Sequence, residues 1–565
     1  MTRRLPSYGF LLFIMVVMGC FFLYPIYNTV REAFTKPGGG FTLEYVGQIF
    51  SNPIYREGLI NALKMAAGST LGAMILALPL AVLSARFSFP MKGLLGALVL
   101  VPLILPPFVG TIGVKQILGQ HGALNALLMP GQIALGEPMD WLGNGRLFGV
   151  ILMNALHLYP ILYLNITASL ANLDPALDEA AENLGCSPWR RFWKITLPLA
   201  MPGIFAGASI VFIWGFTELG VPLMFDYSRV TSVQIFDGIK EIGGNPLPYA
   251  LVAIMLVASV LLFILSKFLF GRSDFAGSGR ASMAAQTPAI GGVKGWLATL
   301  GFALVIFLAV LPHLGVTLTS FATDWNDSVL PSGFTLQHYR DALSHGLTVP
   351  SILNSLKYAG LATFIDVILG VTIAWIVVRT KLPGRHLLDS LSMLPIAVPG
   401  LVLAFGYLAM TREGQPFHWL IGADEDPYWI IVIAYAMRRL PYVVRSASAG
   451  LQQTSVSLEE AAQNLGCPPF RTLFRITLPL ISANLIAGAL LAFSFGMLEV
   501  SDSLILAQKG EHYPITKAIY NLNGALGNGE ALASALGVWA MVFLTITLAG
   551  TGMILGKKMG ALFRA

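Results

Sequence analysis

Five of the ionisable residues within the long apolar stretches of this chain are candidates for function, because a charge there costs free energy. They are Glu218, Glu499, His157, Arg438 and Arg439. Each glutamate stands 20 residues after a Leu-Pro pair, so the two occupy equivalent positions. Two carboxylates placed in this way would line a path for a cation or serve as structural ion-pair partners. The two arginines would pair with Glu218 or Glu499, or attract an anion into the path.

Residue groupings that carry out covalent chemistry are missing from the sequence, and we predict no catalytic residue. No Gly-x-x-x-x-Gly-Lys-Ser/Thr phosphate loop occurs, so we expect neither ATP hydrolysis nor a bound cofactor in this chain. The eight histidines are scattered, and no metal site is predicted. No basic stripe is interleaved with aromatic residues, which argues against a nucleic-acid partner. The sequence therefore favours a transport role over an enzyme.

The composition indicates a membrane protein. Of 565 residues, 55% are hydrophobic and 11% are charged, against about 25% charged in average globular proteins, and the mean hydropathy is +0.71. Apolar runs of about 17 to 25 residues can cross a bilayer as helices. We expect an all-α integral membrane fold with twelve transmembrane helices embedded in lipid. The twelve runs are 9–30, 59–85, 92–113, 147–170, 203–225, 249–270, 293–320, 356–380, 387–411, 428–449, 483–505 and 533–557.

A polar segment between two of these runs occurs twice, 281 positions apart. The first copy reads Glu179-Ala-Ala-Glu-Asn-Leu-Gly185 and the second Glu460-Ala-Ala-Gln-Asn-Leu-Gly466, and nine residues separate each glycine from Ile-Thr-Leu-Pro. We expect a helix, a turn and a second helix over 174–198 and over 455–479. The glycines permit the left-handed conformation that ends a helix. Ser457 with Glu460 forms a capping-box pattern, which predicts Ser457 as the N-cap of the second copy.

The duplication extends over nearly the whole chain and gives two halves of six spans each. Residues 1–271 form the first half, 272–294 a linker rich in Gly, Ser and Ala, and 295–565 the second half. Because six spans return the chain to its starting side, the halves are parallel repeats. Lys and Arg are in excess on the side of the repeated loops, which places these loops and both chain termini in the cytoplasm. The counterpart of Arg438 is His157, so the repeat does not impose the arginine pair.

The repeated segment resembles the EAA loop of permease subunits of binding-protein-dependent ABC importers. The resemblance implies the type I importer permease fold, in the inner membrane of a bacterium. In this family the loop sits in a cleft of an ATPase subunit. The docking residues carried over are Glu179, Ala180, Ala181 and Gly185 in the first copy, and Glu460, Ala461, Ala462 and Gly466 in the second.

The same resemblance implies the partners and the solute. A homodimeric ATPase would bind ATP and Mg and place one subunit on each loop, and a periplasmic binding protein would deliver the solute. Two permease halves fused in one chain resemble the ferric-iron branch, whose relatives also carry thiamine, phosphonates or hexose phosphates. Twelve spans in two parallel halves also describe a secondary transporter of the major facilitator type. That alternative leaves the repeated loops unexplained, and dependence on an ATPase separates it from the importer.

Overall fold

The computed structural model describes residues 5–36, 39–128, 138–143, 146–171, 173, 175–241, 245–270, 288–421 and 426–555. These residues are mostly helical, and within them no β-strand occurs beyond three isolated bridges, so the all-α prediction is confirmed. The helices before the linker are α1 Leu5–Met18, α2 Tyr24–Ala33, α3 Glu44–Ser51, α4 Pro53–Arg86, α5 Lys92–Leu98, α6 Val101–Ile104, α7 Pro107–Leu118, α8 Ala123–Leu128, α10 Leu147–Ala171, α11 Pro175–Asn183, α12 Pro188–Arg191, α13 Leu197–Thr217, α14 Gly220–Met224, α15 Thr231–Asp237 and α16 Leu247–Phe270. The others are α17 Gly292–Phe321, α18 Gln337–Ser344, α19 Thr348–Arg379, α20 Arg385–Ala397, α21 Gly400–Met410, α22 Tyr428–Gln453, α23 Val456–Asn464, α24 Pro469–Thr472, α25 Leu478–Met497, α26 Ser501–Leu506, α27 Ile515–Asn523 and α28 Gly529–Leu555. Three π-helical turns, Gly19–Leu23, Phe192–Thr196 and Leu473–Thr477, and three 3₁₀ turns, Gly238–Glu241, His418–Leu420 and Gly510–His512, complete the helical residues.

Eight of the described helical segments are long and apolar enough to cross a membrane, and two bent pairs bring the number to ten. The pair 92–104 and 107–128 bends by 95°, and the pair α20 and α21 bends by 102°. Pro106 and Pro399 stand at these bends, because proline lacks the N–H that continues a helix. Helices α16 and α22 occupy the two remaining predicted runs, but α22 carries three arginines. The count of twelve therefore stays a prediction.

The two halves have the same helix arrangement, and the first span of each half packs against the other half. α4 packs against α10 and α13, and its equivalent α19 packs against α22 and α25. By contrast, α2 packs on α21 of the other half, and α17 packs on α7. Gly113 in α7 and its counterpart Gly406 in α21 make room for this, because a Cβ would meet the backbone of Pro312 at 1.8 Å and of Pro25 at 2.6 Å. The halves are therefore interlocked.

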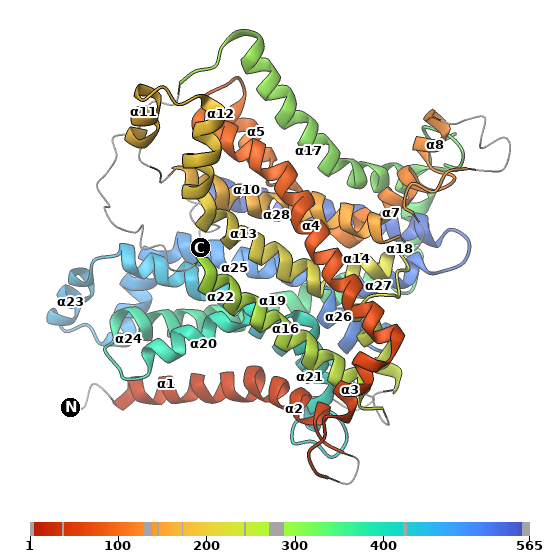
Figure 1. The fold of residues 1–565 in the computed structure, drawn as a ribbon. Coiled ribbons are helices and arrows are strands. Elements are labelled where there is room, and N and C mark those ends of the chain that lie inside the picture. Colours follow the sequence, from red (N-terminus) through yellow and green to blue (C-terminus); the bar gives the residue numbers. More distant parts are fainter. Residues whose placement is uncertain are drawn as a thin grey trace.

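Both repeated loops lie at one end of the molecule, which we call the loop end (Figure 1). Helices α11 and α12 of the first loop and α23 and α24 of the second are found there, and α1 starts at the same end. Helices α8 and α18 lie at the opposite, far end. Residues 272–287 of the predicted linker lie outside the described residues. Its last part pairs with Ser88, which donates to Pro288 O at 3.0 Å and accepts from Ile290 N at 2.8 Å.

Candidate functional site

The two repeated loops have the same backbone turn. In the first, Gly185 N donates to Glu182 O at 2.8 Å and Cys186 N to Ala181 O at 3.0 Å. The second repeats both bonds at 3.0 Å, from Gly466 N to Gln463 O and from Cys467 N to Ala462 O. This is the Schellman motif, which places glycine in the left-handed region. The φ angles of Gly185 and Gly466 are +75° and +87°, so the prediction for these glycines is confirmed.

The start of the second loop differs from the sequence prediction. Ser455, rather than Ser457, precedes the helix, and its Oγ accepts a hydrogen bond from Ser457 N at 3.3 Å. The capping box predicted at Ser457 and Glu460 is therefore wrong. The error has a local cause: Ser455 and Ser457 stand two residues apart, and either hydroxyl suits an N-cap. Residue 174, where the first loop is predicted to begin, lies outside the described residues.

The predicted docking residues divide between a solvent-facing and an inward-facing side. Ala180, Glu460 and Ala461 are exposed. Ala181 and Ala462 are buried, at 6% and 8% exposed, where their carbonyls take part in the turn. Glu179 lies in α11. The loops thus present the first alanine of each pair outward and turn the second toward the protein, and the docking role of all these residues stays a prediction.

The sequence analysis missed a larger shared feature, a set of exposed apolar side chains at matching positions of the two loops. We call it the exposed apolar set. Its first-loop members are Leu177, Leu184, Trp189 and Trp193, at 48%, 87%, 73% and 50% exposed, and its second-loop members are Leu458, Leu465, Phe470 and Phe474, at 47%, 89%, 73% and 54%. Exposed apolar side chains in these polar loops suit contact with a partner protein or with lipid headgroups. Comparing the two copies beyond the Glu-Ala-Ala motif would have found it.

The turn glycines supply a test of how much the loop shape matters. A Cβ at Gly185 or Gly466 would meet no atom within 4 Å, so Gly→Ala changes only the backbone preference. We expect the left-handed conformation to cost about 1–2 kcal/mol in each loop. We therefore expect the Gly185→Ala/Gly466→Ala variant to bind the ATPase expected on these loops more weakly, which a binding titration in detergent measures. Gly301→Ala is the control, because it likewise meets no atom and lies within α17; equal affinities for both variants would contradict the prediction.

Three of the five predicted intramembrane residues form a cluster in the second half. Glu499, which is 3% exposed, pairs with Arg438 Nη1 through Oε1 at 2.9 Å and with Arg439 Nη2 through Oε2. Of the two partners left open for the arginines, the structure therefore gives Glu499. The guanidinium of Arg438 lies against Gly400, where a Cβ would be 1.3 Å from Nη1. Gly400 begins α21 at the 102° bend, so this bend makes the space that the arginine fills.

Two further carboxylates belong to this ion cluster and were missed by the sequence analysis. Asp502 and Asp366 are fully buried, and no described residue donates a hydrogen bond to their side chains. Asp502 Oδ2 lies 3.7 Å from Arg438 Nη1, and Asp366 interacts electrostatically with Arg439. Both residues lie within predicted apolar runs, so listing every ionisable residue in those runs would have found them. The cluster thus holds three side-chain carboxyl groups and two guanidinium groups.

The first half has no equivalent cluster in the described residues. Glu218 Oε1 accepts hydrogen bonds from Gly220 N at 3.0 Å and Val221 N at 3.3 Å, so it caps the short helix α14. His157 Nδ1 lies 2.8 Å from Pro102 O, in the bent span of its own half. Glu218 and Glu499 therefore share a position in the repeat but not a role.

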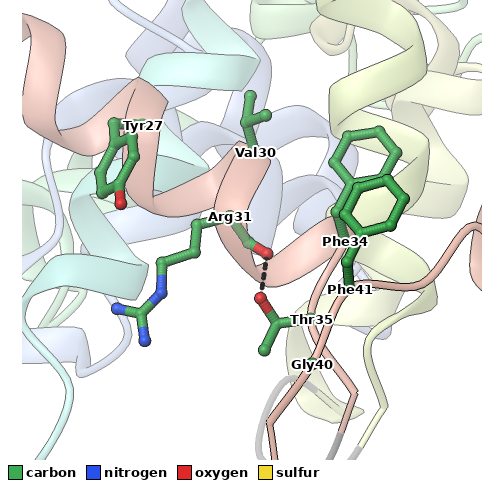
Figure 2. A pocket seen from close by; sticks show the side chains of 7 residues that line it. All are labelled: Tyr27, Val30, Arg31, Phe34, Thr35, Gly40 and Phe41. Atoms are coloured by element: carbon green, nitrogen blue, oxygen red, sulfur yellow. Dashed lines mark hydrogen bonds between the residues drawn. The ribbon is translucent and has the colours of Figure 1, made fainter.

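A surface hollow of about 420 Å³ lies apart from these residues, at the end of α2. Figure 2 shows it lined by α2 and the following turn, with the rings of Phe34 and Phe41 stacked at 5.8 Å. Arg31 O accepts a hydrogen bond there from Thr35 Oγ1 at 2.7 Å. None of the predicted site residues lines it. Within the described residues, no group of three or more His, Cys, Asp or Glu side chains is placed to hold a metal ion.

Comparison with known proteins decides the family. The model of the binding-protein-dependent transport system inner membrane component matches residues 77–275 and 366–557. The chain belongs to this family. It is a permease with the family domain present twice, which confirms the resemblance and the type I importer permease fold.

The similar proteins are named for the transport of different solutes. The ferric transport system permease protein FbpB of Actinobacillus pleuropneumoniae is 28% identical over 473 residues, which cover 82% of this permease and 65% of FbpB. The putative FbpB 1 of Haemophilus influenzae is 28% identical over 476 residues, covering 82% and 71%. The molybdenum transport system permease protein ModB of Escherichia coli K12 is 32% identical over 207 residues, covering 35% and 89%. This permease therefore spans slightly less than two thirds of the first FbpB.

Proposed function

We propose that this permease forms the membrane-spanning subunit of an ABC importer, which moves a small solute, with ferric iron favoured, from a periplasmic binding protein to the cytoplasm by ATP-driven alternating access. The observation that carries the proposal is the pair of loops at one end of the molecule, each with the same turn and the same exposed apolar set. Two like surfaces suit a homodimeric ATPase, which binds ATP and Mg and docks one subunit on each loop. The loop end is then cytoplasmic, together with both chain termini.

The ion cluster supports a cation as cargo. Its three side-chain carboxyl groups supply oxygen atoms, the ligand type that hard cations prefer, while both guanidinium groups are already paired with Glu499. Glu499, Arg438 and Arg439 would border the path on one side, and Glu218 and His157 on the other. An oxyanion such as molybdate or a phosphonate would instead be served by uncompensated arginines.

The test also includes oxyanions, because relatives named for molybdenum and for 2-aminoethylphosphonate transport match this permease at 32% and 28% identity. The experiment is ATP-dependent uptake into proteoliposomes that contain the permease, its ATPase and its binding protein. Ferric iron, thiamine, hexose phosphates, phosphonates and molybdate are compared. The Gly185→Pro/Gly466→Pro variant is the control, because proline cannot adopt the positive φ of either turn.

Uptake of ferric iron that needs ATP and is lost in the proline variant would support the proposal. Uptake of an oxyanion under the same conditions would show that the solute is not ferric iron and would still support an ABC importer. Uptake driven by an ion gradient without the ATPase would contradict the importer and support a secondary transporter.

A further inference from the structure

A buried ion pair joins the second loop to the end of the long helix α19. Arg379, the last residue of α19, donates from Nε to Glu459 Oε1 at 3.1 Å and from Nη2 to Thr454 O at 3.0 Å. The two charged side chains are 8% and 9% exposed. Glu459 lies in α23, directly before Glu460 of the predicted docking surface. Breaking a charged pair that is buried in this way is costly, so the loop and the helix end move as one unit.

The same helix is fastened at the far end of the molecule. Asn354 Nδ2 donates to Glu511 O at 2.8 Å and to Tyr513 O at 3.3 Å, and Ser355 Oγ accepts from Ile515 N at 2.7 Å. The two acceptors belong to the segment that connects α26 to α27, and the donor Ile515 is the first residue of α27. Between Asn354 and Arg379 the helix rises by about 37 Å at 1.5 Å per residue. One continuous helix therefore connects the loop to the opposite surface.

Between its ends, α19 also touches the ion cluster. Ala359 packs against Gly496, where a Cβ would meet the alanine Cβ at 3.2 Å, three residues before Glu499. Asp366, in the middle of α19, interacts electrostatically with Arg439. Because packed interiors resist compression, a shift of α19 along its axis changes the surroundings of Glu499 and of both arginines.

The first half repeats this arrangement with α4. Asn61 Nδ2 donates to Arg229 O at 2.9 Å near the far end, and the Cβ of a residue at Gly215 would meet Ala66 Cα at 3.3 Å. At the loop end, the guanidinium of Arg86 donates to Thr196 Oγ1, in the π-helical turn of the first loop. Asn61, Ala66 and Arg86 are the counterparts of Asn354, Ala359 and Arg379. The partners differ at the loop end, where Arg86 meets Thr196 and Arg379 meets Glu459, but in both halves the helix is fastened to its loop, to its centre and to the far end.

We propose that α19 and α4 are transmission rods, which carry the movement of each loop to the centre of the permease and to its far end. This inference rests on the proposed function, because it requires an ATPase that moves the loops. Arg379 and Glu459 are positioning residues, which contact the loop and the rod but neither solute nor ATPase. Their role is to couple the movement of the second loop to α19, and through α19 to the solute path.

The test uses the complete complex of permease, ATPase and binding protein in proteoliposomes. Arg379→Gln and Glu459→Gln each remove one charge of the pair, and the exchange Arg379→Glu/Glu459→Arg restores it in reverse. We expect both single variants to bind the ATPase and to hydrolyse ATP, while the amount of solute moved per ATP falls about tenfold. The exchange is expected to regain part of the loss. Asn354→Asp, which removes the donor at the far end, is expected to lower the same ratio without touching the loop.

A distance measurement separates transmission from a merely structural role. Spin labels at Ser228 and Lys509, equivalent residues at the far end, report the separation of the two halves there in a background lacking the native cysteines. We expect ATP with vanadate to change this distance in the otherwise unaltered permease but not in the Arg379→Gln variant. Lys381→Gln is the matched control, because Lys381 is an exposed cation two residues beyond Arg379 and is expected to change nothing.

The outcomes distinguish the rods from the importer itself. An Arg379→Gln variant with the normal solute-to-ATP ratio and the normal distance change would overturn the rods while the importer stands. Loss of ATPase binding in that variant would also overturn them, because the pair would then only shape the docking surface. A complex with unaltered permease that shows no ATP-dependent uptake would contradict the proposed function, and the rods with it.

Discussion

The Leu184→Asp/Leu465→Asp permease is expected to lose its ATPase while remaining folded. These leucines are the most exposed members of the exposed apolar set, at 87% and 89%, so the change buries no charge in the permease itself. Surface substitutions of this kind usually alter the free energy of unfolding by no more than about 0.5 kcal/mol. At a protein interface, by contrast, a carboxylate placed in an apolar pocket costs about 2 kcal/mol or more, which weakens binding about 30-fold at each loop.

The measurement is co-purification of the ATPase with the permease, followed by titration of the complex in detergent. Leu526→Asp is the matched control, because Leu526 is 98% exposed and lies between α27 and α28, away from both loops. Each single variant is expected to weaken ATPase binding by a factor of roughly the square root of the fold-change measured for the double variant, because the two loops bind one partner. Unchanged ATPase binding in the double variant would show that the exposed apolar set serves another purpose, such as contact with lipid headgroups.

The outline of the fold could be predicted from the sequence, because long apolar runs and a repeated motif are both strong signals. The turn at Gly185 and Gly466 followed from glycine chemistry alone. The exchange of first spans could not be predicted, because hydrophobic patterning shows that a helix exists but not which neighbour it packs on. The physical cause lies in Gly113 and Gly406, whose missing side chains admit the span from the other half.

Site residues could be predicted where both halves carry the same residue at equivalent positions, and were missed where only one half carries an ionisable residue. Glu499 and Glu218 were found because they match, yet the structure gives them different partners. Asp366 and Asp502 have Ala73 and Val221 as their counterparts, so a search for matched residues passed over them. Which guanidinium meets which carboxylate depends on how α22 packs at the bend before α21, and such tertiary contacts leave no periodic signal in the sequence.

The difference between the matched glutamates predicts a large loss of stability for one Glu→Gln substitution and a small change for the other. Glu499→Gln leaves the guanidinium groups of Arg438 and Arg439 without their shared carboxylate, in a site where Glu499 is 3% exposed. Loss of one partner of a buried pair costs about 3–5 kcal/mol, so we expect a clearly lower melting temperature and a lower yield of folded permease. Glu218→Gln keeps the side-chain oxygen that caps α14, and we expect a change of no more than about 1 kcal/mol.

Thermal unfolding of the two purified variants, followed by fluorescence-detected size exclusion, provides the comparison. Equal losses of stability would contradict the assignment of Glu499 as the centre of the ion cluster.

The Arg439→Gln/Glu499→Gln double variant separates the effect on stability from the effect on transport. It removes one charge of each sign and leaves Arg438 beside Asp502 at 3.7 Å. If the cluster borders the path of a cation, this double variant regains much of the stability lost by Glu499→Gln but not the uptake. Recovery of both would make the pair structural and move the path away from Glu499.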